Sequence, residues 1–177
     1  SLGMRPNGFI SYMYELTPYI KFDAKNVISV RVDHSKSADS RYYTGSGIYR
    51  DVYLVYANPV HIDLWGVYHT TPEVSKEKAS VHVQTTIVNT SNSRTDLVIV
   101  NEILDKNNKV VSKNSKKTSI LPSVTDTVKQ DLKFDHPNLW SIHNPYLYKV
   151  TTSIYQWKNL IDKATGKTGY QLAIEND

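Results

Sequence analysis

The sequence predicts an all-β protein, and three observations support this. Short segments rich in Val, Ile, Thr and Tyr alternate apolar and polar residues with a period of two, as in strands with one buried face. Asparagine and proline clusters interrupt these segments at the short intervals typical of a β-sandwich. No segment of the sequence carries the sustained apolar stripe of a helix. We expect an immunoglobulin-like β-sandwich that is preceded by part of another β-domain.

Nine strands are expected in order along the chain. They cover residues 9–14, 26–32, 49–56, 60–69, 79–89, 96–104, 110–113, 127–134 and 146–157. The alternation is clearest around Val81 and Val83, where His82 and Gln84 occupy the intervening positions. A period of two sends one of these rows toward a core and the other toward solvent.

The Asn58-Pro59 pair is the predicted domain boundary. Proline has no backbone N–H for a central ladder, and it biases the preceding residue toward an extended bend. Residues 1–58 hold only three expected strands, which are too few to close a sandwich. Residues 59–157 hold enough strands for a complete immunoglobulin-like sandwich, and residues 158–177 are expected to be a linker.

The apolar rows of the first 58 residues need a cover. We expect them either to pack against the second domain or to pair with another copy of the chain, and the second outcome is favoured. A homo-oligomer is therefore one expected assembly. The side chains that should lose exposed area are Tyr12, Tyr14, Ile28, Val30 and Tyr53.

Composition excludes several classes of function. The net charge of +4 is spread along the 177 residues, and the lysines between positions 106 and 117 are typical of a solvated hairpin, so no nucleic-acid partner is expected. No apolar run reaches the ~20 residues needed to insert into a membrane. Cysteine is absent, which excludes disulfides and thiol nucleophiles.

Metal and cofactor sites are not expected either. The six histidines show no metal-ligand spacing, and no glycine-rich phosphate loop is present. His61 and Asp63 share one face of a strand, but no third ligand accompanies them. The compartment stays open, and a periplasmic or extracellular location is compatible with the sequence.

Several blocks of the sequence stand in a characteristic order. Residues 7–20 and 26–33 are followed by Ser40-Arg41-Tyr42-Tyr43-Thr44-Gly45-Ser46-Gly47-Ile48-Tyr49-Arg50-Asp51-Val52. Leu139-Trp140-Ser141 and Asn144-Pro145-Tyr146 form a later block. In order and spacing these blocks resemble the family 2 glycoside hydrolases, which include β-galactosidases and β-glucuronidases.

The resemblance implies a modular enzyme in which a jelly-roll sugar-binding domain, an immunoglobulin-like sandwich and a catalytic (β/α)8 barrel follow one another. It identifies residues 1–58 as the end of the jelly roll, 59–157 as the sandwich and 158–177 as the linker toward a barrel absent from this chain. Retaining hydrolysis uses two carboxyl groups, which the resemblance places on that barrel. No catalytic residue is therefore expected here, and Glu102 is expected to be an ordinary outward strand residue.

The resemblance also implies a substrate-proximal loop that approaches the barrel mouth. A guanidinium can hydrogen-bond sugar hydroxyls, and an aromatic ring can stack on the apolar face of a pyranose. The candidate residues are Arg41, Tyr42, Tyr43 and Arg50. A structural role competes with this interpretation, and it is favoured for Arg50. In it, Tyr49 and Val52 are strand core and Arg50 pairs with Asp51 or a neighbouring domain.

Tryptophans more often fill sandwich cores or domain seams than bind sugars. Trp65 and Trp157 are therefore expected at such places, and Trp140 in the core.

The sequence thus favours a non-catalytic β-sandwich part of an enzyme whose whole form hydrolyses β-linked glycosides, with carbohydrate as the partner of that whole enzyme. A free-standing carbohydrate-binding module is an alternative, favoured if an exposed aromatic row lies on one sheet. An adhesive surface module without a ligand is the third hypothesis.

Overall fold

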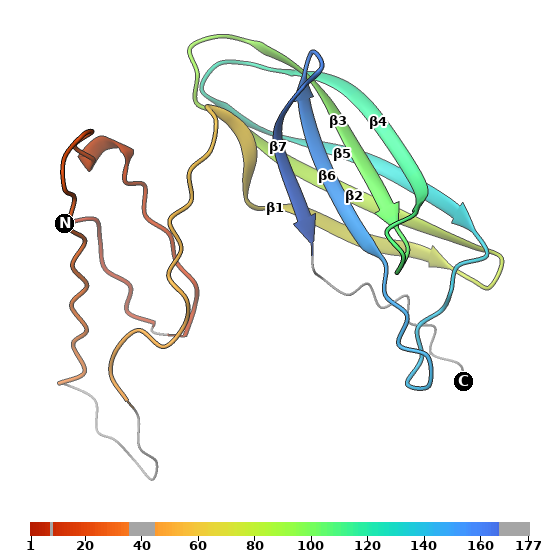
Figure 1. The fold of residues 1–177 in the computed structure, drawn as a ribbon, viewed down its shortest axis with the longest axis horizontal. Coiled ribbons are helices and arrows are strands. Elements are labelled where there is room, and N and C mark those ends of the chain that lie inside the picture. The colour runs from red at the N-terminus through yellow and green to blue at the C-terminus, as the bar shows by residue number, and fades with distance from the viewer. Residues whose placement is uncertain (8, 36–44, 167–177) are drawn as a thin grey trace. The chain divides into compact units, whose positions relative to one another are not determined.

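The structure is a computed structural model that describes residues 1–7, 9–35 and 45–166 (Figure 1). The chain separates into two compact units, residues 1–53 and residues 54–177. Each unit is described by itself below.

The described residues of the second unit form seven antiparallel strands in two sheets (Figure 1). The strands are β1 (Val60–Val74), β2 (Lys78–Asn89), β3 (Thr95–Leu104), β4 (Val110–Ile120), β5 (Val124–Asp135), β6 (Lys149–Gln156) and β7 (Asn159–Gly166). One sheet has the order β1-β2-β5 and the other the order β4-β3-β6-β7. This arrangement confirms the predicted all-β sandwich. The fourth strand pairs with the third, whereas in a constant-type immunoglobulin domain the fourth strand lies in the opposite sheet.

The core lies between the two sheets and is made by alternate residues of the central strands. The side chains that are wholly or almost wholly inaccessible to solvent include Val83 and Ile87 of β2, Ile99 and Ile103 of β3, and Ile154 of β6. Full burial of such a side chain contributes roughly 1.5–3 kcal/mol. The inward row predicted around Val81 and Val83 is confirmed, and these positions anchor the sandwich.

A buried polar bridge crosses this core. The Asn101 Nδ2 group of β3 donates to Gln130 Oε1 of β5 at 3.0 Å, and Thr152 Oγ1 of β6 donates to Asn101 Oδ1 at 2.6 Å. All three side chains are buried. Because an unpaired polar group in an apolar interior is costly, the bridge favours one alignment of the two sheets over its alternatives.

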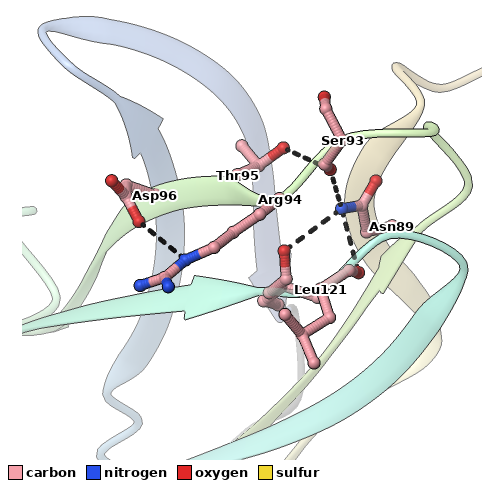
Figure 2. A network of polar contacts seen from close by, with 7 residues as sticks. Asn89, Ser93, Arg94, Thr95, Asp96 and Leu121 are labelled. Carbon is pink, nitrogen blue, oxygen red and sulfur yellow. Dashed lines mark hydrogen bonds and ion pairs between the residues drawn. The ribbon is translucent and has the colours of Figure 1, made fainter.

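A second buried amide ties two turns together at one end of the sandwich (Figure 2). Asn89 ends β2, and its Nδ2 group donates to the carbonyls of Ser93 at 2.9 Å and Leu121 at 3.1 Å (Figure 2). Its Oδ1 atom accepts from the Ser91 N–H at 2.9 Å. One side chain thus satisfies backbone groups of both the β2–β3 and the β4–β5 turns.

The open seam between β4 and β5 is closed by side chains. Side chains of every second residue of β4 donate to backbone carbonyls of every second residue of β5. The pairs are Ser112 to Lys133, Asn114 to Asp131 and Lys116 to Lys129, at 2.7, 2.7 and 3.3 Å. Both strands are sheet edges, and unprotected edges invite association with other chains. The first lysines of the run, up to position 109, lie in the β3–β4 turn, and the later ones lie on the edge strand β4. This strand extends to Ile120 instead of ending at Lys113 as expected.

The strand β7 lies in the segment expected to be a linker. Asn159–Gly166 pairs with β6 after a hairpin turn at Trp157 and Lys158. Ile161 and Ala164 pack against the core from this strand. Only three of its eight residues have apolar side chains, and these do not alternate with polar residues. Periodicity alone therefore does not predict a strand here.

The first unit shows no strand among its described residues. Its one regular element is a short 3₁₀ turn, η1 (Thr17–Tyr19). The strands expected at 9–14, 26–32 and 49–56 are not formed, because no described segment supplies a hydrogen-bonded ladder to them. Ile28 and Tyr53 are exposed in this chain. Within the part of the chain that the structure describes, no helix is long and apolar enough to cross a membrane.

Candidate functional site

The predicted substrate-proximal loop is only partly described. Arg41, Tyr42 and Tyr43 lie outside the described residues. Arg50 is exposed, and its guanidinium carbon lies 5.2 Å from the centre of the Tyr49 ring. At this distance the cation is attracted by the negative face of the ring, which restricts the arginine rotamers. Arg50 and Tyr49 therefore present a cation and an aromatic ring together to solvent.

The residues that follow Arg50 are exposed as well. Tyr53 donates its hydroxyl hydrogen to Asp51 Oδ2 at 2.9 Å, and this hydrogen bond raises the pKa of Tyr53. The expectation that Tyr49 and Val52 are strand core is wrong for this chain, because both side chains are largely exposed. Gly47 has a φ of 141°, a backbone conformation that suits glycine.

Glu102 occupies an outward position of β3, as predicted. Its neighbours Asn101 and Ile103 point into the core, and its Oε1 atom lies 2.8 Å from the Lys113 ammonium directly opposite on β4. The hydrogen bond from Lys113 to Glu102 raises the pKa of Lys113. Glu102 is thus half of a cross-strand ion pair, a structural arrangement that requires no catalytic role.

The histidines of the sandwich have separate environments. His61 Nδ1 lies 2.8 Å from the Asn58 carbonyl oxygen, and His82 Nδ1 lies 2.7 Å from Asp131 Oδ1 on the outer face of one sheet. His69 is half-buried on β1, and burial lowers its pKa to about 4. Among the described residues, no three His, Asp or Glu side chains are grouped so that they could hold a metal ion.

The Asn58-Pro59 junction is anchored to two parts of the sandwich by three hydrogen bonds. Asn58 Nδ2 donates to the Ile161 carbonyl of β7 at 2.7 Å. The Pro59 carbonyl accepts from the Thr90 N–H at 2.8 Å and from the Thr90 hydroxyl at 3.1 Å. The entry into β1 is therefore held by β7 and by the β2–β3 turn.

A β-bulge of four residues interrupts β1 just after this junction, and it was not predicted from the sequence. Ile62 pairs with Ile87 and Val67 pairs with Thr85, so residues 63–66 face a single residue of β2. Trp65 stands in the bulge with a φ of 55° and 72% of its surface exposed. The Trp65-Gly66 pair inside an alternating strand was the available signal.

Neither of the other two tryptophans lies in the core of the sandwich. Trp157 stands in the β6–β7 hairpin turn and is 83% exposed, and Trp140 is only half-buried. The assignment of Trp140 to the core is therefore wrong. Trp65 and Trp157 fill no core in this chain, and their location at domain seams stays a prediction.

Comparison with known proteins places the chain in a family. The sequence profile described as "Glycosyl hydrolases family 2" matches residues 60–170, more than half of the chain. The β-galactosidase BoGH2A of Bacteroides ovatus is 36% identical over 169 residues, which cover 96% of this chain and 20% of that protein. A β-glucuronidase of Formosa agariphila is 29% identical over 181 residues, covering 91% of this chain and 18% of its own length.

Solved structures agree with these sequence matches. The crystal structure of a glycosyl hydrolase family 2 member from Bacteroides cellulosilyticus has a TM-score of 0.82 and 37% identity, covering 88% of this chain and 21% of that one. The chain thus spans about a fifth of the length of these relatives. The strand order, the sequence profile and the relatives lead to one conclusion: this chain belongs to family 2 of the glycosyl hydrolases.

Proposed function

We propose that this chain is a non-catalytic β-sandwich part of a glycoside hydrolase whose whole form cleaves β-linked glycosides with retention of configuration. The observation that carries the proposal is the family match over residues 60–170, in relatives about five times as long as the chain. Retaining hydrolysis needs an acid/base carboxyl and a nucleophilic carboxylate about 5–5.5 Å apart. In the proposal both belong to a barrel outside residues 1–177.

The proposal divides the chain as the sequence suggested. Residues 1–58 are the last part of a jelly-roll sugar-binding domain, 59–157 are the core of the immunoglobulin-like domain, and the remainder leads toward the barrel. The start of β1 at Val60 and the anchored Asn58-Pro59 pair support the first boundary. The strand β7 moves the end of the sandwich to Gly166.

In this proposal the loop of Arg41, Tyr42, Tyr43 and Arg50 lies near the substrate in the whole enzyme. The exposed pairing of Arg50 with the Tyr49 ring supports this, because the two groups offer hydrogen-bond donors and an apolar surface to a sugar. Carbohydrate is then a ligand of the assembled enzyme, with this loop supplying only part of its contacts.

The free-standing carbohydrate-binding module receives less support. Such a module would bind through several exposed aromatic rings on one sheet. On the outer face of the β1-β2-β5 sheet, the register aligns Tyr68 with Gln84 and Lys129, so a single aromatic ring lies in that row. The other exposed ring of this sheet, Trp65, lies in the bulge of β1 and outside that row, so the described residues form no aromatic row on which a sugar could stack.

The test is mechanism-based labelling of the protein that contains this chain. A 2-deoxy-2-fluoro β-galactoside or β-glucuronide is expected to label it covalently, and peptide mapping should place the sugar on a carboxylate outside residues 1–177. The 177-residue chain should show neither labelling nor hydrolysis of chromogenic substrates. A labelled peptide inside the chain, for example at Glu102, would contradict the proposal, and inversion of configuration would contradict the retaining mechanism.

A related proposal concerns the exposed apolar side chains of residues 1–53. In the whole protein the preceding jelly-roll strands cover them, and in the isolated 177-residue chain they cause self-association. Light scattering after size exclusion is expected to give more than one copy for residues 1–177 and a monomer for residues 54–177. If both proteins, residues 1–177 and residues 54–177, are monomeric at high concentration, the homo-oligomer is no longer part of the proposal.

A further inference from the structure

The apolar core of the sandwich is divided into two clusters by one polar layer. In the strands β2, β3, β5 and β6, an inward residue separates a member of one cluster from a member of the other. On β2, for example, Val83 belongs to the first cluster and Ile87 to the second, and Thr85 lies between them. The members of the layer are Thr85 of β2, Asn101 of β3, Gln130 of β5 and Thr152 of β6, and all of them are buried.

Thr85 is the member of this layer that has no partner. Asn101 joins Gln130 and Thr152 in the bridge described above. The Thr85 Oγ1 atom is buried and makes no hydrogen bond with any described residue. Because a buried hydroxyl without a hydrogen bond destabilises the folded state, most such groups in proteins have a protein or water partner. The Thr85 hydroxyl is therefore expected to have a partner within the layer.

Thr85 lies next to the bridge. It pairs with Val128, and Val83 pairs with Gln130, so Thr85 and Gln130 are diagonal neighbours on the inner face of one sheet. Diagonal neighbours on two strands are roughly 7–8 Å apart, which long side chains can partly span. A water molecule between two such groups joins them through two hydrogen bonds of roughly 2.8 Å each.

The bridge has N–H groups left to donate to a water molecule. Each side-chain amide carries two N–H donors. Among the described residues, Gln130 Nε2 donates only to the Ile99 carbonyl oxygen, at a long 3.5 Å, and Asn101 Nδ2 donates only to Gln130. A water molecule that accepts from the Gln130 amide can donate to Thr85 Oγ1, and both groups are then satisfied.

We propose that the polar layer holds one ordered water molecule, which accepts a hydrogen bond from the Gln130 amide and donates one to Thr85 Oγ1. The apolar clusters on either side of the layer separate this water from solvent, so it exchanges slowly. It extends the bridge from β3, β5 and β6 to β2. The alignment of the two sheets then depends on a hydrogen-bonded network that includes all four strands.

Thr151 provides a matched control. Its Oγ1 atom also has no partner among the described residues, and the residue is 5% exposed. It belongs, however, to the outward row of β6, where its neighbours are Glu102 and Thr165. Solvent lies directly outside this row, so a transient water can serve Thr151 and none has to be held in the interior.

Oxygen-17 relaxation dispersion of the solvent tests the proposal, because it detects water that stays inside a protein long enough to tumble with it. In the 177-residue chain, Thr85→Val is expected to lower the amplitude of this signal by the contribution of one water molecule. Thr85→Ser keeps the hydroxyl and should retain the signal. Thr151→Val should also retain it.

The melting temperature gives a second measurement, whose sign separates two explanations. Valine has nearly the shape of threonine but no hydroxyl. If the water is present, Thr85→Val removes one of its partners, and the melting temperature should fall by about 4 °C. If the Thr85 hydroxyl is only an unsatisfied group, the same substitution removes it from the core, and the melting temperature should rise.

A third measurement needs no substitution. In the unmodified chain, nuclear Overhauser peaks are expected between a bound water and the side chains of Thr85 and Gln130. Their absence would overturn the inference, and so would a rise in the melting temperature of Thr85→Val or an unchanged dispersion signal in that variant. Loss of the signal in Thr151→Val alone would place the water on the outer face of the other sheet and would contradict the proposal as well.

Discussion

Residues 26–32 and residues 79–89 have the same alternating pattern and different structures. In the first stretch Ile28 is 62% exposed and its backbone makes no ladder among the described residues. In the second, Val83 and Ile87 are fully buried between two sheets. The difference is that β2 has β1 on one side and β5 on the other, both within the same chain.

This contrast shows what an alternating pattern means physically. The period of two indicates which side chains can share a buried face. Whether that face forms depends on the presence of a hydrogen-bonding partner strand. An isolated strand leaves its backbone groups to water and buries no side chain, so it gains little free energy against the entropy of ordering. Four predictions follow this difference from its largest expected effect to its smallest.

Truncating a side chain in the core of the sandwich should give the largest loss of stability. Ile99→Ala removes a fully buried side chain and is expected to lower the free energy of unfolding by about 2–5 kcal/mol. Ile28→Ala is the matched control in the first unit and should change it by less than about 0.5 kcal/mol. Urea unfolding of the 177-residue chain measures both. Equal losses would show that residues 26–32 are packed in solution.

The second largest effect is expected when a buried amide is replaced, because this should lower the free energy of unfolding more than replacing an exposed one. Asn101→Leu leaves the Gln130 amide and the Thr152 hydroxyl without their partner inside the core, at a cost of about 1–3 kcal/mol. Asn26 also makes close hydrogen bonds, to the Lys21 N–H at 2.9 Å and the Lys21 carbonyl at 2.8 Å, but it is exposed. Asn26→Ala should cost less than Asn101→Leu in the same unfolding experiment. The reverse order would place the more important polar contacts in the first unit.

The third largest effect is the loss of stability at acid pH, which is expected to arise from His69 in the sandwich. Burial lowers the pKa of His69 to about 4, so between pH 6.5 and 4 the unfolded chain binds more protons than the folded one. Stability therefore falls as the pH drops through that window, by about 1 kcal/mol once the half exposure of the ring is allowed for. His69→Phe should remove this part of the pH dependence, which unfolding midpoints at pH 7, 5.5 and 4 measure. An unchanged slope in the variant would show that His69 is solvated.

Surface ion pairs should show the smallest effect in either unit. Lys113 lies 2.8 Å from Glu102 across two strands, and Arg31 lies 3.0 Å from Asp33 two residues away. Lys113→Gln and Arg31→Gln should leave the unfolding midpoint unchanged at ~0.15 M salt, where exposed charges are screened. At low salt only Lys113→Gln should lower it, because the Glu102 side chain is the more buried carboxylate. A larger effect of Arg31→Gln would indicate order in the first unit that the sandwich does not share.

The central strands were the most predictable part of the fold. Residues 79–89 and 96–104 alternate strongly because each has one face on the core, and the structure places strands at Lys78–Asn89 and Thr95–Leu104. The edge strands were harder. In β4 both faces are largely polar because its side chains reach across the seam to β5, and this removes the alternation that would mark a strand.

The candidate site was predictable only in part. The motif around Arg50 identified a family, and the profile over residues 60–170 agrees with that identification. The bulge at Trp65 was not foreseen, because a bulge arises from a mismatch in register between two strands and a single strand does not reveal its register. The glycine that permits it is visible in the sequence, but the two carbonyl oxygens that require it come from Asp63 and Thr86.

The sequence by itself determined the fold class, the family and the inward rows of the central strands. These follow from local properties: residue type, the period of two, and motifs of adjacent residues. Only the tertiary structure decided the strand β7, the bridge from Asn101 to Gln130 and Thr152, and which alternating rows are buried. Each of these depends on a partner far away along the chain, because burial and hydrogen bonding are properties of pairs of segments and not of one segment.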